Sequence, residues 1–500
     1  MIPRSRRAPR FRLAVEVAGA AAFLFVASSS HAQFIAYESH LAELPLFDSR
    51  SSARLLGMGG LELVIPDENR EINLFDFGRN LAGLAADKDG WSLETQYGRL
   101  IDALDYSSEL GGAPIAQRQV INQHSANTQI IFRQGGRRAV GTTIQFDSQD
   151  QDYRFGADNL MRGPRVSGYY NDRFGPVSLA IGLTRWTDNE DVASPDIFSI
   201  RHESSTWLVN LAAATRAAGF EWGVEADFEN VTIRGKSRDA AGFHQDEFQW
   251  RRPATNLRAT AILARPGRLQ AGFNLASGSR NGTEEAKISW ADRFPQNPGR
   301  FYYAVRVPTF HEEESEWSLE GRASYRLQGS LRASLYGNTS GFSSDVTEAG
   351  NWIGSRRAQK LDDANARVGG GLSKGFVGDR VLVGLEGFGI FRTRDLTLSR
   401  AKSSISSRQL AGTLGAEWMV GPGFAVRGGY LVRNNDEDVD APETLSKGNG
   451  WSLGFGYLPR GGMVALDGAV RSVGLDPDGT TSTNLRTDQT EYLVAARFIL

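Results

Sequence analysis

Apolar and polar residues alternate along residues 408–433 in two runs separated by a short break. Leu410, Leu414 and Trp418 share one parity in the first run, and Glu417 has the other parity. Successive side chains of a strand point to opposite faces, so the pattern predicts two strands of about ten residues joined by a tight turn at residues 420–423. The second run, residues 424–433, carries Arg427 on its polar face. Strands that are apolar on one face and polar on the other are typical of transmembrane barrels.

The same unit recurs from Trp91 onward. Gly and Pro supply the backbone angles of tight turns, and alternating segments flank short breaks at residues 134–137, 174–176, 217–219, 265–268, 327–330, 374–379, 420–423 and 459–462. Eight turns and two terminal strands predict 2 × 8 + 2 = 18 strands within a range of about 14 to 18. The predicted fold is all-β: a transmembrane antiparallel β-barrel, which residues 91–500 would form. A large soluble β protein is the alternative.

Longer polar connections lie between these turns. They are expected at residues 147–152, 187–195, 278–298, 341–354, 434–442 and 474–487. Alternation of short and long connections is typical of a barrel whose turns lie on one side of the membrane and whose loops lie on the other. The even strand count would place both ends of the barrel on the periplasmic side. A set of aromatic residues near strand ends or on the apolar face is expected to form interfacial girdles, with core packing in a soluble β protein as the alternative. They are Trp186, Trp207, Trp222, Trp317, Trp418, Tyr430 and Trp451.

The first 32 residues resemble a secretory signal peptide in their charge and apolar pattern. Five arginines precede a largely apolar run at residues 13–26, and small residues stand near Ala32, where cleavage is expected. A membrane anchor is the alternative, but Glu16 interrupts a run that is already short for a span. Removing residues 1–32 takes away five arginines and one glutamate, so the net charge moves from −2 to −2 − (5 − 1) = −6.

Composition excludes several classes of function. The chain contains no cysteine, so disulfides, thiolate metal sites and cysteine nucleophiles are absent. The acidic balance argues against nucleic acid as a partner. No stretch after residue 32 is apolar enough for a helical span, whereas alternation would hide a lipid-facing surface from the mean hydropathy of −0.34.

Residues 33–90 lack the hairpin pattern and are expected to form a partly helical or looped segment that precedes the first strand. Two motifs stand in this segment: an Ala-Arg-x-x-Gly-Met-Gly-Gly run and an Asn-x-Ala-Gly-Leu run. Their residues are Ala53, Arg54, Gly57, Met58, Gly59 and Gly60, then Asn80, Ala82, Gly83 and Leu84. Both motifs resemble the start of the FadL-type family of outer-membrane transport proteins, a broad family that includes PorV-like shuttle barrels. Leu81 replaces the family's usual proline, and the family's fourteen strands differ from the count of eighteen. A Gly-rich turn before the first strand is the plain alternative.

The resemblance implies a hatch. In that family the N-terminal segment plugs the lumen and must shift before a ligand passes. Arg54, residues 57–60, Asn80 and residues 82–84 would then belong to a gate, and the ligand would be a small, hydrophobic compound.

No catalytic constellation or metal-ligand spacing stands out, so we expect no enzyme activity, no cofactor and no metal site. Acidic clusters at residues 312–314 and 436–440 could hold calcium, although solvated loops are the simpler interpretation. Glu225, Asp227, Glu417 and Arg427 are expected to face the lumen and to pair across strands.

These patterns predict an outer-membrane barrel that passes small compounds. The alternative is a non-transporting surface barrel that anchors or shuttles partner proteins. The expected partners are outer-membrane lipid and lipopolysaccharide, together with the barrel-assembly machinery, which would recognise the alternating strand at residues 491–500.

Overall fold

The computed structural model describes residues 52–61, 63–64, 89–110, 113–153, 156–194, 198–239, 244–263, 269–291, 301–303, 307–348, 358–398, 401–439, 444–457, 459, 464–477 and 483–499. The predicted signal peptide and cleavage site, and most of the predicted segment at residues 33–90, lie outside these residues.

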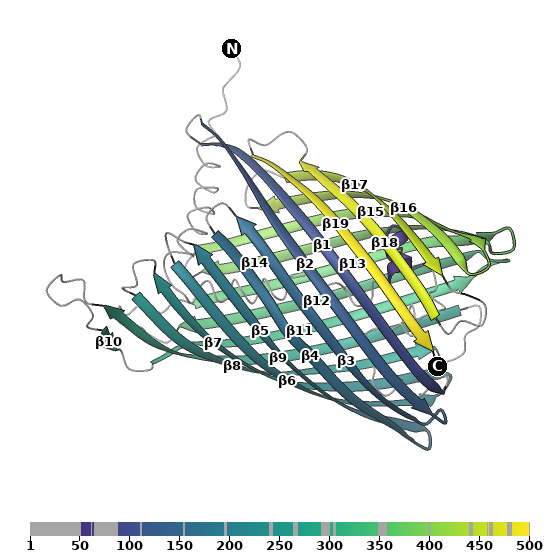
Figure 1. Ribbon diagram of the computed structural model, residues 1–500, viewed down its shortest axis with the longest axis horizontal. Coiled ribbons are helices and arrows are strands. Elements are labelled where there is room, and N and C mark those ends of the chain that lie inside the picture. Colours follow the sequence, from purple (N-terminus) through teal and green to yellow (C-terminus); the bar gives the residue numbers. More distant parts are fainter. Residues whose placement is uncertain are drawn as a thin grey trace, which may run out of the picture.

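The described chain forms one closed antiparallel sheet (Figure 1). It contains nineteen strands. One of them, β10 (Phe301–Tyr303), has three residues and pairs only with the far end of β9. The other eighteen form the barrel, because β1 pairs with both β2 and β19. The predicted count of eighteen is confirmed. Closure leaves no unpaired strand edge, which a lipid environment requires.

The strands of the first half are β1 (Gly90–Leu110), β2 (Ala113–Gln134), β3 (Arg138–Tyr153), β4 (Gly156–Phe174), β5 (Val177–Ser194), β6 (Phe198–Ala217), β7 (Phe220–Asp239), β8 (His244–Leu263) and β9 (Leu269–Ala291). Those of the second half are β11 (Val307–Arg326), β12 (Arg332–Glu348), β13 (Ala358–Phe376), β14 (Val381–Leu398), β15 (Ala401–Gly421), β16 (Phe424–Val439), β17 (Thr444–Tyr457), β18 (Val464–Pro477) and β19 (Thr483–Ile499).

Strands end and begin on either side of all eight predicted short turns, and these turns share one end of the barrel. The start of β1 lies at this end, because Ser92 pairs with Ile499 near the end of β19. In the hairpin of β15 and β16 the turn is Pro422–Gly423, and Gly423 has φ +87°, a conformation that favours glycine.

The predicted loops at the opposite end are largely strand. Residues 147–152 belong to β3, residues 341–348 to β12 and residues 434–439 to β16. The strands have 14 to 23 residues rather than about ten. Antiparallel pairing satisfies backbone groups whatever the side chains are, so the strands continue beyond the apolar belt with polar residues on both faces.

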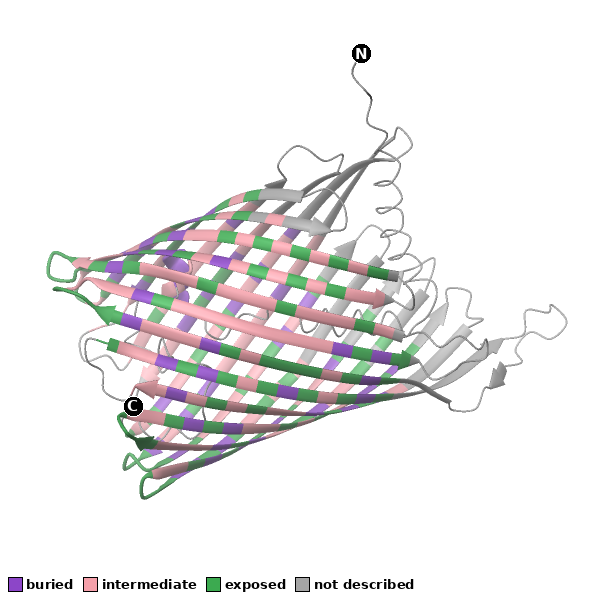
Figure 2. Ribbon diagram, turned by 180° about the vertical axis from the view of Figure 1, so that it is seen from behind, coloured by how far each residue is buried: buried purple, intermediate pink, exposed green. Residues whose placement is uncertain are grey.

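The outer surface of the barrel is apolar where the alternation is strict. Six of the seven predicted girdle residues are 44–57% exposed and point outward: Trp207, Trp222, Trp317, Trp418, Tyr430 and Trp451. The prediction was wrong for Trp186, which has the inward parity of β5 and lies under the Arg165 guanidinium. Exposed and buried residues alternate along the strands (Figure 2), with polar side chains on the inner face. An apolar outside and a polar inside define a transmembrane barrel rather than a soluble one.

A short helix, α3 (Ala53–Gly57), lies inside the barrel against β17 and β18, near the short-turn end (Figure 1). In the described part of the chain, no helix is long and apolar enough to cross a bilayer.

Candidate functional site

Residues 52–61 with Leu63 and Val64, called the lumen segment below, lie against the inner wall. Ser52 caps α3, because its hydroxyl accepts a hydrogen bond from the Leu55 N–H at 3.0 Å. The helix ends after one turn, where Gly59 and Gly60 both have positive φ angles, +86° and +85°. This local geometry turns the chain so that residues on both sides of the bend face the wall.

Apolar side chains of the lumen segment fill two patches of the wall. Ala53 and Leu56 pack against Leu493 of β19, and all three are almost fully buried. Further along, Met58, Leu61, Leu63 and Val64 form a buried cluster that packs against partly buried side chains of β12 and β14, namely Tyr336, Leu382 and Phe388. The lumen segment therefore covers apolar side chains of the inner wall at this level.

Glycines of the wall let the two backbones touch. A Cβ added to Gly415 would overlap the Met58 carbonyl, and one added to Gly429 would overlap the Gly59 backbone. A Cβ on Gly57 would lie 2.9 Å from the Cα of Gly454. Any side chain at these wall positions would separate the segment from the barrel. The resemblance implied that residues 57–60 belong to a hatch in the lumen, but nothing in the sequence pointed to the wall glycines that receive them.

Four charged groups join the lumen segment to β15, β16 and β18. Arg54 makes a bidentate ion pair with Glu417, with Nη2–Oε1 at 2.7 Å and Nε–Oε2 at 2.9 Å. Arg427 donates to the same carboxylate at 2.7 Å and to Asp467 at 2.6 Å. Glu417 and Arg427 pair across neighbouring strands, as predicted. The two arginines and the two carboxylates balance in charge, so this partly buried network has no net charge.

Hydrogen bonds to wall side chains hold the backbone of the lumen segment. Glu386 of β14 accepts hydrogen bonds from the N–H groups of Leu63 and Val64, at 2.6 and 2.8 Å through the same oxygen. The Ser373 hydroxyl donates to the Val64 carbonyl at 2.7 Å, and the Ser452 hydroxyl donates to the Gly57 carbonyl at 3.0 Å. These wall residues therefore fix the position of the segment's backbone along the inner wall.

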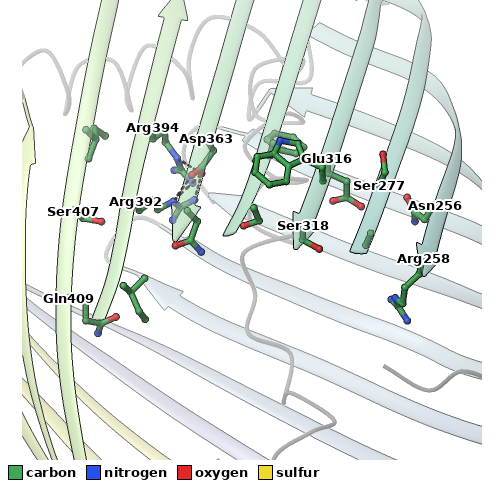
Figure 3. Close-up of a pocket in the computed structure, with 18 of the residues that line it drawn as sticks. Asn256, Arg258, Ser277, Glu316, Ser318, Asp363, Arg392, Arg394, Ser407 and Gln409 are labelled. Atoms are coloured by element: carbon green, nitrogen blue, oxygen red, sulfur yellow. Dashed lines mark hydrogen bonds and ion pairs between the residues drawn. The ribbon is translucent and has the colours of Figure 1, made fainter. Parts of the chain in front are cut away.

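A cavity of about 760 Å³ opens along the inner wall between β7 and β16. Its inward-facing lining is mostly polar, and Asp363 lies between Arg392 and Arg394 (Figure 3). Asp363 accepts hydrogen bonds from both guanidiniums. Glu316 and Arg258 lie further along the same wall. The lumen therefore presents charged and amide groups to a solute.

The first acidic cluster is not a loop. Residues 312–314 belong to β11, and Glu312 faces inward, where its carboxylate accepts from the Arg252 Nε at 2.8 Å. Arg252 also pairs with Glu314 at 3.1 Å and stacks over the Trp250 ring. Only Glu313 is exposed, because alternation turns it outward. The solvated-loop interpretation was wrong for Glu312 and Glu314. It was also wrong for residues 436–439, which belong to β16.

The structure brings together part of the predicted gate. Arg54, Gly57, Met58, Gly59 and Gly60 all lie in the lumen segment. Asn80, Ala82, Gly83 and Leu84 lie outside the described residues. Sequence reasoning missed the receiving residues Glu386, Ser373, Ser452, Gly415, Gly429 and Gly454. In the sequence, the only feature that marks them is a glycine, serine or glutamate at a strand position that alternation directs toward the lumen.

Among the described residues, no group of three or more His, Asp or Glu side chains could hold a metal ion.

No family model and no curated protein matches the sequence. Solved structures with a similar architecture include the Pseudomonas putida toluene transporter TodX, at 9% identity and TM-score 0.38, covering 90% of this chain and 98% of that chain. They also include the CymD monoaromatic hydrocarbon channel, at 12% identity and TM-score 0.32, with 90% and 97% covered. A third is the RagAB peptide transporter, at 7% identity and TM-score 0.44, with 76% and 76% covered. Similarities at this level carry no weight for family or substrate.

Proposed function

We propose that this protein is an outer-membrane barrel through which small solutes pass, and that the lumen segment is its gate. The observation that carries the proposal is a segment bound inside the barrel by non-covalent contacts to residues of β12–β19. The apolar belt would be in contact with outer-membrane lipid and lipopolysaccharide, and β19 would be the strand that the assembly machinery recognises.

The contacts of the lumen segment suit a part that is held firmly and can be released. The hydrogen bonds and ion pairs of the segment are made to side chains that line the lumen. When the segment leaves the wall, water can hydrate these side chains, so undocking does not leave unpaired charges in lipid. Arg54 supplies one of the two positive charges of the network with Glu417, Arg427 and Asp467. When the segment leaves, the three wall residues keep a net negative charge. Docking is therefore favoured, and it stays reversible.

The polarity of the lumen bears on the solute. The apolar patches at the short-turn end are covered by the segment itself, and the cavity above is lined by charged and amide side chains. This favours a polar solute over the hydrophobic compound that the FadL-like resemblance implies.

Deletion tests the gate directly. The mature protein and a form lacking residues 33–90 would be reconstituted in planar bilayers and in liposomes. Single-channel conductance and swelling are expected to rise on deletion, because the segment occupies the lumen. Negligible permeability of both forms would contradict transport and favour the anchor or shuttle function, whose test is co-purification of partner proteins with the intact barrel.

A reversible lock tests the need for movement. Because the chain has no cysteine, the pair Ala53→Cys and Leu493→Cys, which belong to one packed cluster, can be cross-linked selectively. Oxidation is expected to lower permeability, and a reductant to restore it. The two single-cysteine variants serve as controls, and a gel-mobility shift reports the cross-link. Permeability that is equal in the oxidised and reduced states would show that passage does not require undocking.

A further inference from the structure

One lumen arginine stands apart from the others in its surroundings. Arg433 of β16 faces inward, and its Nε is buried without a hydrogen-bond partner. Two further arginines, Arg367 of β13 and Arg471 of β18, are close enough to repel the charge of Arg433. A guanidinium that is largely removed from water and faces like charges is destabilised unless an anion approaches it.

Its two neighbours are held in place by other contacts. Arg367 lies over the Phe388 ring at 4.2 Å and over Tyr336 at 5.4 Å, which fixes the guanidinium plane. Arg471 pairs with Glu491 at 2.6 Å, and a Cβ on Gly60 would lie 2.9 Å from its Nη1. Arg471 therefore reaches over the lumen segment, and these arginines lie directly next to the proposed gate.

The row of lumen-facing arginines continues from Arg367 to two arginines that line the cavity. Arg367 is opposite Ile390 in the register of β13 and β14, and Arg392 and Arg394 follow on the same inward face. Both of these arginines bind the same carboxylate, that of Asp363. We call this set the arginine track: Arg394, Arg392, Arg367, Arg433 and Arg471.

Other lumen arginines are matched more closely by acids. Arg54 and Arg427 have Glu417 and Asp467, and Arg252 has Glu312 and Glu314. Arg433 differs from these arginines, because its buried Nε has no hydrogen-bond partner and two other arginines lie beside it.

We propose that the arginine track binds an oxyanion, the carboxylate or phosphate of a small polar solute, with Arg433 as its central contact. The planar guanidinium fork matches both groups in bidentate geometry, and charge-assisted hydrogen bonds are the strongest kind available. The inference deepens the proposed function, since it names the class of solute that would reach the gate.

Equilibrium binding tests the proposal without requiring passage. The full mature barrel in detergent would be titrated calorimetrically with inorganic phosphate and with succinate, and with choline as the cationic control. We expect both anions to bind and choline not to bind. R433Q is expected to weaken anion binding by about tenfold. R433K, which keeps the charge and loses the fork, is expected to have an intermediate effect.

R280Q is the matched control, because Arg280 faces the same lumen from β9, pairs with Glu314 at 3.1 Å, and lies outside both the track and the lining of the cavity. It is expected to change anion binding by less than about twofold. Absence of anion binding to the unmodified barrel would overturn the proposal. So would unchanged binding by R433Q, or an equal loss in R280Q.

A second measurement needs no variant. Anomalous diffraction from the unmodified barrel soaked with selenate should show a peak in contact with Arg433, and a peak only elsewhere, or none, would also overturn the proposal. Vesicles that stay impermeable while the barrel binds phosphate would refute the gate and leave the oxyanion site standing. Permeable vesicles with no anion binding would refute the oxyanion site and leave the proposed passage of solutes standing.

Discussion

At the scale of single residues, the lumen segment depends on a few close approaches and on one shared carboxylate. Arg54 and Glu417 are separated by 363 positions in the chain, yet they form the central ion pair of the site. Arg54 stands in a motif that the sequence singled out. Glu417 was expected to face the lumen and pair with a neighbouring strand, and it does so with Arg427.

Replacing Glu417 should release the lumen segment. Glu417→Gln removes the carboxylate that binds both Arg54 and Arg427. Breaking a buried pair of this kind costs about 3–5 kcal/mol. The expected result is faster trypsin cleavage after Arg54 in the folded barrel. Glu225→Gln, at an inward carboxylate of β7 that does not touch the segment, is the control and should leave the cleavage rate unchanged. Equal rates in the wild type and Glu417→Gln would mean that this pair does not hold the segment.

Two adjacent glycines of β16 offer a sharper comparison. A Cβ on Gly429 would overlap the Gly59 backbone, whereas one on Gly428 would make an ordinary 3.9 Å contact with the Ser452 carbonyl. Gly429→Ala should therefore weaken docking by about 1–3 kcal/mol, the usual cost of overpacking. Single-channel recordings should show more open time for Gly429→Ala than for Gly428→Ala. The same open time in both variants would contradict the close backbone approach.

At the scale of the strands, strict alternation assigns each residue to lipid or to lumen. The prediction for the β15–β16 hairpin was confirmed in this respect, since Leu414 and Trp418 are exposed outward while Glu417 and Arg427 are buried inside. The predicted length was wrong. Pairing extends well past the apolar belt, because backbone hydrogen bonds do not depend on side-chain polarity.

Neighbouring positions of β11 test this assignment. Leu319 is 49% exposed and points outward, and Ser318 lines the cavity beside Glu316. Leu319→Arg should destabilise the barrel in bilayers by about 2–4 kcal/mol, the cost of a lipid-facing arginine near the midplane. Ser318→Arg should cost much less, because its charge meets water and carboxylates. Urea unfolding in liposomes would measure both, and a reversed order would contradict the orientation of β11.

At the scale of the whole molecule, pairing of β1 with β19 turns eighteen strands into a closed wall with a polar interior. Closure removes every sheet edge, and it also brings β16–β19 around the lumen segment, so the end of the chain forms the surface that receives residues near its beginning.

A closed barrel of this kind should resist detergent. The unheated protein is expected to migrate faster on a gel than the boiled protein, and to fractionate with the outer membrane. Recovery as a soluble periplasmic protein, with mobility unaffected by boiling, would contradict the transmembrane assignment.

The sequence by itself determined the fold class, the eight turns and the strand count, since both the period-two alternation and the turn residues act over a few neighbouring positions. It also marked residues 53–60 as special. Only the tertiary structure decided which wall residues receive that segment. Glu386, Gly415 and Gly429 are unremarkable within their own strands, and they become a site only when closure places them opposite Val64, Met58 and Gly59. The same holds for Arg433, whose two arginine neighbours come from strands that are distant in sequence.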